Sequence, residues 1–365
     1  MSIRNIIDKP FLPEDAGVTA TDVVITSRVR LARNLCDFAF PGRATSAQKR
    51  EVLSRCRAAV LKLSEMDGGS FHEMDELNKL EKQVLVERHL ISRELTEVDR
   101  AGIAISQDLS SSIMINEEDH LRMQVLLPGF SLEKTWKIMI EIDTHLEESL
   151  DFAFVDNLGY LTACPTNLGT ALRASMMLHL PGLVMANQME KVVRAVNQLG
   201  IAVRGLYGES SEASGSLFQI SNQQTLGEDE GTIIARLNNV LATVIDHETN
   251  ARHKLVETSQ DLIFDKIGRA FGILQNGHLL SSNESMNSLS LVRLGLDLGL
   301  LPLEHRTLLD RLFIESQPGH VQIAAGQETS PDERDRHRAT QIRNAFRKLP
   351  LLDFDKFQKP STSES

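Results

Sequence analysis

Apolar residues recur with two different spacings along the chain, and this change limits the fold more than any other feature. Leu121, Met123, Val125 and Leu127 occupy every second position, which is typical of a strand that buries one face. Beyond Asp229 the apolar residues instead recur like one face of a long helix, at positions 233, 237, 240, 241 and 244. No proline occurs between residues 181 and 302. We therefore expect a mixed α/β part followed by a helical C-terminal third.

The same spacings predict individual elements and a division into domains. Amphipathic helices are expected from Ser46 to Met66 and from about Leu132 to Leu150. Strands are expected at Ala101–Ser106, Ser112–Ile115, Leu121–Leu127, Phe152–Val155, Ile201–Leu206 and Ser216–Ser221. The expected division is a domain of residues 1–255, a helical domain of residues 256–352, and a flexible tail of residues 353–365, which has too little apolar content to offset the entropy of ordering it.

Composition excludes several classes of protein. A net charge of −11 disfavours nonspecific nucleic-acid binding and favours cationic partners. The three cysteines, Cys36, Cys56 and Cys164, include no CxxC pair, so neither a disulfide framework nor a cysteine zinc site is predicted. No uncharged apolar run reaches the roughly 18 residues of a membrane span, and the N-terminus lacks a signal segment. We therefore expect a cytoplasmic protein that does not enter a membrane.

Arginines in separate segments suggest a phosphate site. Arg28 and Arg30 alternate on one predicted strand, so their side chains face the same way, and Arg122, Arg173 and Arg204 follow near other strand or turn ends. A guanidinium fork matches phosphate oxygens, and several forks together would form a triphosphate cradle. Neither a GxxxxGK[ST] loop nor a kinase-type Gly-rich loop with Asp-Phe-Gly occurs, so a nucleotide would need such a cradle. Taken singly, each arginine is better explained as a surface or ion-pair residue.

Carboxylates form a second candidate group. Glu117, Glu118 and Asp119 follow a predicted strand, and Glu209 follows the turn that begins at Arg204. Such clusters commonly just face solvent. A guanidinium substrate changes the interpretation, because its nitrogen lone pair is delocalised and its pKa exceeds about 12, so it must be oriented and relieved of a proton. Two carboxylates flanking the guanidinium would do both.

Cys164 and a late pair of arginines are further candidates. The segment from Cys164 to Thr170 is interpreted as a turn into a helix that carries Arg173, where the helix dipole and cations would ionise the thiol. A buried structural cysteine is the alternative. Arg334 and Arg338 lie four apart on one predicted helix face and would grip a phosphoryl group, with Asp335 beside them for a guanidinium. The alternative there is a solvated helix with ion pairs.

Four strings, in order, resemble the guanidino (phosphagen) kinase family. They are Ser27-Arg28-Val29-Arg30, Asn116-Glu117-Glu118-Asp119-His120-Leu121-Arg122, Cys164-Pro165-Thr166-Asn167-Leu168-Gly169-Thr170 and Arg204-Gly205-Leu206-Tyr207-Gly208-Glu209. The closest likeness is to the bacterial branch that phosphorylates arginine residues of proteins. Only 26 residues precede Ser27, too few for the helical N-terminal domain of small-guanidino kinases. The string Arg334-Asp335-Arg336-His337-Arg338-Ala339 also fits the RDxxRA pattern of that branch.

The resemblance implies roles for single residues. Glu118 and Glu209 would be the catalytic carboxylates, and Cys164 the active-site thiol. The implied ATP contacts are Ser27, Arg28, Val29, Arg30, His89, Arg122, Arg173, Ala174, Ser175, Met176, Met177, Arg204, Gly205, Leu206, Tyr207, Gly208 and Glu209. The implied phosphoarginine site is Arg334, Asp335, Arg338 and Ala339, and no protein-held metal is implied.

The resemblance also implies a fold and a function. The fold would be a glutamine-synthetase-like α/β catalytic domain, with a curved, mainly antiparallel sheet backed by helices, followed by a helical C-terminal domain. The activity would use ATP and Mg²⁺ to phosphorylate arginine residues of substrate proteins and mark them for Clp-type proteolysis. The implied partners are a zinc-binding activator protein and a second copy of the chain, with no direct nucleic-acid or membrane partner. Two alternatives stay open: a kinase for free arginine, and a phosphoarginine-binding adaptor with weak catalysis.

Overall fold

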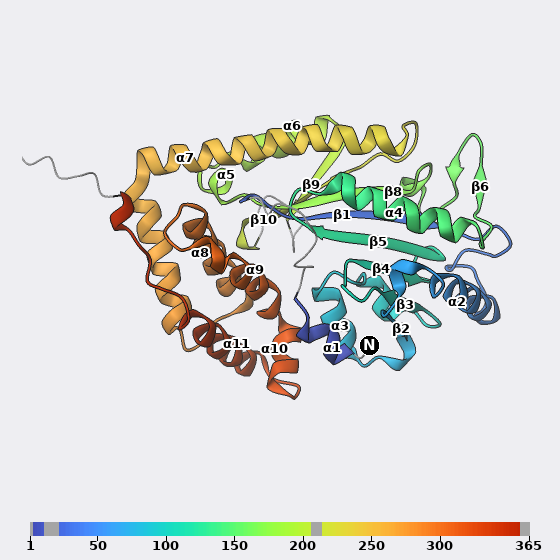
Figure 1. The fold of residues 1–365 in the computed structure, drawn as a ribbon, viewed down its shortest axis with the longest axis horizontal. Helices are drawn as coiled ribbons and strands as arrows, with labels where there is room; N and C mark the ends of the chain where they lie inside the picture. The colour runs from blue at the N-terminus through green and yellow to red at the C-terminus, as the bar shows by residue number, and fades with distance from the viewer. Residues whose placement is uncertain (1–2, 11–21, 206–213, 358–365) are drawn as a thin grey trace, which may run out of the picture. The chain divides into compact units, whose positions relative to one another are not determined.

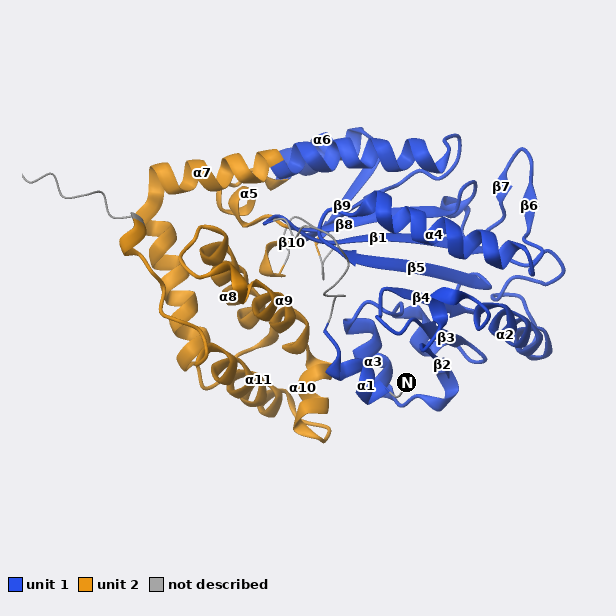
Figure 2. Ribbon diagram, in the orientation of Figure 1, with its two compact units in different colours: residues 1–178, 190–204, 218–245 blue, residues 179–189, 205–217, 246–365 orange. Residues whose placement is uncertain are grey.

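The computed structural model describes residues 3–10, 22–205 and 214–357. The chain divides into two compact units, which Figure 2 colours separately. Unit 1 comprises residues 1–178, 190–204 and 218–245, and unit 2 comprises residues 179–189, 205–217 and 246–365. Neither unit is one continuous segment of chain, and the domain limits expected at residues 255 and 352 stay a prediction.

A single large sheet organises unit 1. Within the described residues it has eight strands, in the order β2-β3-β4-β5-β1-β8-β10-β9. Neighbouring strands from β2 across to β8 pair antiparallel. In that spatial order the strands are Ser70–Glu73, Gly102–Ile105, Ser111–Ile115, Leu121–Pro128, Val24–Arg33, Leu172–His179, Leu217–Asn222 and Ile201–Gly205. The predicted α/β class with a mainly antiparallel sheet is confirmed.

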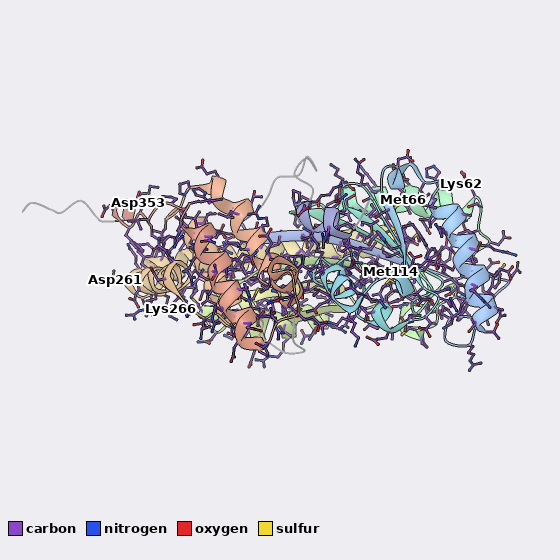
Figure 3. The ribbon with its side chains drawn as sticks, turned by 90° about the horizontal axis from the view of Figure 1, so that it is seen from below. Lys62, Met66, Met114, Asp261, Lys266 and Asp353 are labelled. Carbon is purple, nitrogen blue, oxygen red and sulfur yellow. The ribbon has the colours of Figure 1, made fainter. Side chains whose placement is uncertain are left out.

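Helices cover this sheet. α4 (Leu132–Glu147) packs along β1 and β5 (Figure 1), and α2 (Ser46–Val60) packs on β3 and β4. A capping box starts α2, in which the side chains of Thr45 and Gln48 each accept a backbone N–H of the other residue. α2 buries Cys56, and burial raises the pKa of that thiol to about 12, so Cys56 is a packing residue. Figure 3 shows Lys62, after α2, at the outside of unit 1 and Met114 of β4 inside it.

Shorter elements complete unit 1. α1 (Ile3–Asp8) buries Ile3 and Ile6 in an apolar cluster with residues of α3 (Lys79–Glu87) and β3. α6 (Met189–Gln198) precedes β9, and β6 (Phe154–Val155) pairs with β7 (Gly159–Tyr160) as a separate two-stranded hairpin. The helix predicted to reach Met66 ends at Val60, and Ser64–Met66 forms a separate 3₁₀ turn.

The helix predicted to carry Arg173 is wrong, because Leu172–His179 is strand β8. The segment is rich in leucine, alanine, arginine and methionine, which favour helices in isolation. Pairing with β1 overrides that preference, since Arg30 lies opposite Arg173 and Val29 opposite Ala174 in the ladder. Only a short 3₁₀ turn, Pro165–Asn167, follows Cys164, so the predicted helix dipole at the thiol is absent there.

Helices dominate unit 2, as predicted for the C-terminal third. The long helix α7 (Glu230–Asn276) starts in unit 1 and has a kink at Ser259 (φ −148°, ψ 36°). It is followed by α8 (Ser282–Asp297), α9 (Arg306–Glu315), α10 (Pro318–Ala325) and α11 (Pro331–Phe346), while α5 (Pro181–Met185) comes from an earlier part of the chain. Gly295 allows α7 and α8 to pack closely, because a Cβ there would lie 2.7 Å from Ile267 Cγ2.

A buried charge network stabilises unit 2. Asp297 pairs with Arg252 at 2.9 Å, with Arg293 at 3.2 Å and with Arg306 at 2.7 Å. Glu248 accepts hydrogen bonds from Arg252 and from the backbone N–H groups of Gly182 and Leu183, so it caps α5. None of the helices in the described part of the chain is long and apolar enough to cross a membrane.

Candidate active site

A cavity of about 530 Å³ lies within unit 1, and six of the predicted site residues line it: Arg30, Glu118, Arg122, Cys164, Arg173 and Arg204. Its lining residues come from β1, β5, β8, β9 and β10, from the segment of residues 94–98 and from the turns around residues 117–119 and 164–167. The lining residues are Arg30, Leu31, Ala32, Glu94, Val98, Glu117, Glu118, Asp119, Arg122, Cys164, Thr166, Asn167, Ala171, Arg173, Arg204 and Gln219. Segments far apart in sequence thus meet around one space.

The sheet register explains why the arginines converge. Arg30 of β1 lies directly opposite Arg173 of β8, and Ala32 of β1 lies opposite Arg122 of β5. Residues opposite one another, and residues two apart on a strand, share a face of the sheet. Arg28, Arg30, Arg122 and Arg173 therefore project from the same face. Arg204 of β9 lines the cavity as an exposed side chain.

These arginines repel one another electrostatically. Burial first, and then the charges of Arg122 and Arg173, lower the pKa of Arg28 to about 10. The pKa of Arg30 is also lowered, first by burial and then by neighbouring arginines. The Nε of Arg30 is buried and has no hydrogen-bond partner within the described residues. Arg122 has an ion pair with Glu117, whereas Arg28, Arg30 and Arg173 have no carboxylate partner within the described residues. A polyphosphate has the charge and the oxygen acceptors to match them.

Gln219 of β10 is a residue that the sequence did not predict for the site. Its side-chain oxygen accepts a hydrogen bond of 2.7 Å from Arg28, and the residue lines the cavity. A lone glutamine in a strand pattern gives no functional signal. Only the sheet order, which brings β10 next to β8, reveals this contact.

The two adjacent glutamates have different environments. Glu117 is buried, pairs with Arg122 and accepts a 2.6 Å hydrogen bond from Ser92 Oγ. Burial opposes ionisation of Glu117, but Arg122 and the hydrogen bonds from Ser92 and from Glu118 N together outweigh it and lower the pKa of this carboxyl. Glu118 is exposed, and its carboxylate has no hydrogen bond or ion pair among the described residues. Burial first, then the charges of Asp119 and Glu117, raise the pKa of Glu118. Glu118 is therefore the carboxylate available to accept a proton.

Cys164 lies at the cavity wall with intermediate exposure, and it is not a buried packing residue. Its Sγ is 3.0 Å from Thr166 Oγ1. Burial first, and then the charges of Arg204 and Arg122, lower the pKa of Arg173, which lines the same cavity. The thiol thus faces the same space as Glu118 and the arginines.

A smaller pocket lies beside Arg28. It is lined by Thr26, Arg28, His89, Leu126, Ser175, Met177 and Gln219. Burial and the charges of Arg28 and Arg30 lower the pKa of His89 to about 3, so His89 is neutral at physiological pH. His89 also has a positive φ of 58°, an uncommon conformation for a residue other than glycine. Ser175 and Met177 alternate with Arg173 on one face of β8 and line this smaller pocket, while their role as nucleotide contacts stays a prediction.

Other predicted nucleotide contacts are not brought to the cavity by their side chains. Ser27 is fully buried, donates to Gly129 O at 2.8 Å and accepts from Ser131 N at 2.9 Å, so it fixes the start of α4. Val29, Ala174 and Met176 are buried on the opposite face of the sheet. Gly205 ends β9, and Leu206, Tyr207, Gly208 and Glu209 lie outside the described residues. The roles implied for all these residues stay predictions.

The predicted phosphoarginine residues lie on α11 in unit 2. Arg338 is 1% exposed and donates to Ser316 O and Leu280 O, both at 2.7 Å, and to Asp335. Ala339 is fully buried. Arg334 and Asp335 are partly exposed, and Arg334 donates to Thr329 O at 2.8 Å. The predicted spacing is therefore present, but Arg338 holds neighbouring backbone while Arg334 and Asp335 stay accessible.

Two families match the sequence. Residues 51–251 match the family described as ATP:guanido phosphotransferase, C-terminal catalytic domain. Residues 260–359 match the family described as protein-arginine kinase McsB C-terminal domain. The expected resemblance to guanidino kinases is thereby confirmed.

Relatives and solved structures agree with these matches. The chain is 47% identical to a protein-arginine kinase of Brevibacillus brevis, over 90% of this chain and 92% of the relative, and 46% identical to one of Bacillus velezensis, over 88% and 90%. A duplicated taurocyamine kinase from Schistosoma mansoni aligns with a TM-score of 0.57 at 27% identity, covering 66% of this chain and 36% of that chain. A lombricine kinase aligns with a TM-score of 0.56 at 25% identity, covering 66% of this chain and 72% of that one. The chain therefore belongs to the protein-arginine kinase family of ATP:guanido phosphotransferases.

Proposed function

We propose that this enzyme transfers the γ-phosphoryl group of ATP to the guanidinium group of arginine residues in substrate proteins. The observation that carries the proposal is the cavity in which uncompensated arginines, an unpaired carboxylate and a thiol converge. The arginines suit a triphosphate, and Glu118 with Cys164 suits a cationic guanidinium. Membership of the protein-arginine kinase family supports the choice of substrate.

In the proposed reaction, a guanidinium nitrogen of the substrate attacks the γ-phosphorus of ATP. A P–N bond forms, the bond between the γ-phosphorus and the β,γ-bridging oxygen breaks, and ADP leaves. Arg28, Arg30, Arg122 and Arg173 neutralise the phosphate charge, so that catalysis depends on positioning and electrostatics.

Glu118 accepts the proton that the attacking nitrogen loses. Its raised pKa brings this carboxyl nearer to the working pH and makes it a stronger base than an ordinary glutamate. Cys164 lies on the same cavity wall and adds a polarisable group beside the substrate cation. By the family resemblance, Glu209 is the second carboxylate, and it lies outside the described residues.

Mg²⁺ is proposed to accompany ATP. The described residues include no group of three or more histidine, cysteine, aspartate or glutamate side chains arranged to hold a metal ion, so we assign no protein ligand to it. Mg²⁺ in such sites is held largely by the substrate phosphates and by water, and it supplies further neutralisation of their charge.

Mass spectrometry after incubation with MgATP would test the proposed function. The substrates are an unfolded basic protein and free arginine, handled under non-acidic conditions because phosphoramidates are acid-labile. Glu118→Gln keeps the side-chain shape and removes the base, while Glu97→Gln is a matched control at an exposed site that does not line the cavity.

Phosphoarginine on the protein that disappears in Glu118→Gln but not in Glu97→Gln would support the proposal. Transfer to free arginine alone would identify a small-guanidino kinase. Transfer to neither substrate would favour an adaptor that only binds phosphoarginine.

We further propose that Arg334 and Asp335 bind phosphoarginine, with Arg338 and Ala339 holding the frame around them. Arginine provides a fork for the phosphoryl oxygens, and aspartate provides an acceptor for the guanidinium. Calorimetry with free phosphoarginine, on the whole chain and on Arg334→Gln, would measure this binding; heat that is equal in the two proteins would contradict it.

The family resemblance supports four additional proposals. Phosphorylated proteins would pass to a Clp-type protease, a zinc-binding protein would activate the kinase, the chain would form a homodimer, and the protein would be cytoplasmic. Size-exclusion chromatography with light scattering would test the dimer directly.

A further inference from the structure

Asp119 links the two catalytic segments of the proposed site. It follows Glu118 in the sequence, but its environment is the opposite, since Asp119 is 2% exposed. Its Oδ1 accepts a 2.7 Å hydrogen bond from the backbone N–H of Ala163, which immediately precedes Cys164. The same oxygen accepts a 2.6 Å hydrogen bond from Asn34 Nδ2. One buried carboxylate oxygen thus connects the turn of Glu118 to the segment of Cys164.

Asn34 uses its whole side chain to hold this junction. Its Nδ2 also donates to Leu161 O at 3.0 Å, and its Oδ1 accepts from His120 N at 2.9 Å. Two acceptors on one side and a backbone donor on the other fix the orientation of the amide. Asn34 is 1% exposed, so each of these bonds is shielded from water. Asn34 therefore joins the end of β1, the turn after Glu118 and the segment before Cys164.

His120 fixes the same turn from the other side. Its Nδ1 accepts from Leu35 N at 3.0 Å, so the proton is on Nε2, which donates to Ala39 O at 3.1 Å. Burial lowers the pKa of His120, which keeps the ring neutral and preserves the acceptor. The turn that presents Glu118 is consequently held on both sides.

We propose that Asp119, oriented by Asn34, is a positioning residue that fixes Glu118 relative to Cys164 and keeps a second negative charge beside the base. This inference rests on the proposed function, because it assumes that Glu118 accepts the proton. Asp119 itself has no assigned contact with a substrate. It acts through the two residues that do.

The electrostatic part of the proposal follows from the charges around Glu118. Asp119, Glu117 and Glu94 act to raise its pKa, and Arg122 acts to lower it. Cys164, Arg173 and Arg204 line the same cavity. Among the charged neighbours, Asp119 has the largest effect, after burial. Removal of its charge lowers the pKa of Glu118, so Glu118 becomes a weaker base that stays ionised to lower pH.

Two substitutions separate the charge from the hydrogen bonds. Asp119→Asn removes the charge but retains an oxygen that can accept from Ala163 and Asn34. Asn34→Leu keeps the charge and removes the donor and the acceptor that orient the junction. Asp99→Asn makes the same chemical change at an exposed site that does not line the cavity, and it serves as the control.

The measurement is steady-state phosphoryl transfer to an unfolded basic protein across pH, with circular dichroism to verify folding. For Asp119→Asn we expect the acidic limb of the kcat/KM profile to move down by about half a pH unit or more, as expected for loss of a neighbouring charge. For Asn34→Leu we expect kcat to fall by roughly 10-fold or more, with KM for ATP within about 2-fold, because the arginine cradle is untouched.

The outcomes distinguish this inference from the proposed function. A wild-type chain that phosphorylates no guanidine would reject the proposed function itself. A Glu118→Gln chain that keeps full activity would remove the assignment of Glu118 as the base. An active wild type together with an Asp119→Asn profile identical to that of Asp99→Asn would overturn the present inference alone. The pH profile decides it even if Asn34→Leu fails to fold, since a purely structural role of Asp119 would not move the acidic limb.

Discussion

Arginines cluster in two different environments in this molecule. Around the cavity in unit 1, Arg28 and Arg30 lie among other arginines, and mutual repulsion adds to burial in lowering their pKa values. In unit 2, Arg252 and Arg293 are more deeply buried and face the carboxylates of Glu248, Asp297 and Asp310. Charge left uncompensated in a cavity indicates a place for an anionic ligand, whereas compensated charge stabilises the fold.

The strongest test of this comparison removes the carboxylate that three arginines share. Asp297→Ala leaves Arg252, Arg293 and Arg306 as buried cations without their common partner. We expect the free energy of unfolding to fall by about 3–5 kcal/mol, the usual cost of breaking a buried pair. Denaturant unfolding would measure it, and Asp265→Ala, which breaks an exposed pair with Arg269, should leave the transition unchanged. Equal stability of the two variants would contradict the structural role.

The converse substitution in the cavity should affect binding and not stability. Arg30→Met removes one of the repelling cations and keeps an apolar stem of similar length. We expect KM for ATP to rise by roughly 10- to 100-fold, corresponding to the loss of a charged hydrogen bond, with no loss of melting temperature. Arg33→Met is the matched control on the same strand, since Arg33 pairs with Asp143 at 2.6 Å. The control should have a lower melting temperature than wild type. A lower melting temperature for Arg30→Met, with none for Arg33→Met, would mean that Arg30 stabilises the fold and does not bind the ligand.

The ion pair of Glu117 and Arg122 lies at the cavity but is compensated, so it combines features of both environments. We expect it to make the free energy of unfolding depend on pH. The pKa of Glu117 is lower in the folded chain than when unfolded, so its contribution is present above the unfolded pKa and is lost as pH falls through the folded value. Glu117→Gln should reduce the free energy of unfolding at pH 7 by about 1 kcal/mol. Wild type and variant should converge as the pH falls below the folded pKa. A constant difference at every pH would exclude this carboxyl as its source.

The sequence predicted much of the fold where local pattern and final structure agree. β3, β4 and β5 lie where strands were predicted, β5 from its apolar alternation, and the C-terminal helices follow their repeat. β8 could not be predicted in this way, because the residues around Arg173 favour a helix and become a strand only by pairing with β1. Long-range pairing is not encoded in a local window of residues.

The residues of the candidate site likewise include some that the sequence predicted and some that it did not. Motif order placed Glu118, Cys164 and the arginines in one set; all of them except Arg28 line the cavity, and Arg28 lines the smaller pocket beside it. Gln219 and Asn34 gave no signal, because their contacts reach 191 and 85 residues along the chain. Arg334 and Arg338 have the predicted spacing of four, yet their burial differs, since helix periodicity gives direction but not what packs against each face.

The smallest expected effect concerns the cavity rim, where Glu94 supplies an exposed negative charge. Glu94 lines the cavity together with Glu118, and its charge acts on both Glu118 and Arg122. An exposed carboxylate beside the site of a cationic substrate should favour its approach, with a gain comparable to an exposed ion pair. We expect Glu94→Gln to raise KM for a protein substrate by about 2- to 3-fold and to leave KM for ATP unchanged.

Salt provides the check on this last prediction. The difference between wild type and Glu94→Gln should shrink as ionic strength rises, because exposed charges are screened over about 8 Å at physiological salt. Glu97→Gln, on the same 3₁₀ turn Glu94–Glu97 but away from the cavity lining, should behave like wild type. If KM for the protein substrate rises in Glu94→Gln by the same factor at every salt concentration, this carboxylate contacts the substrate directly. Glu94 would then be a binding residue of the cavity and not only a charge at its rim.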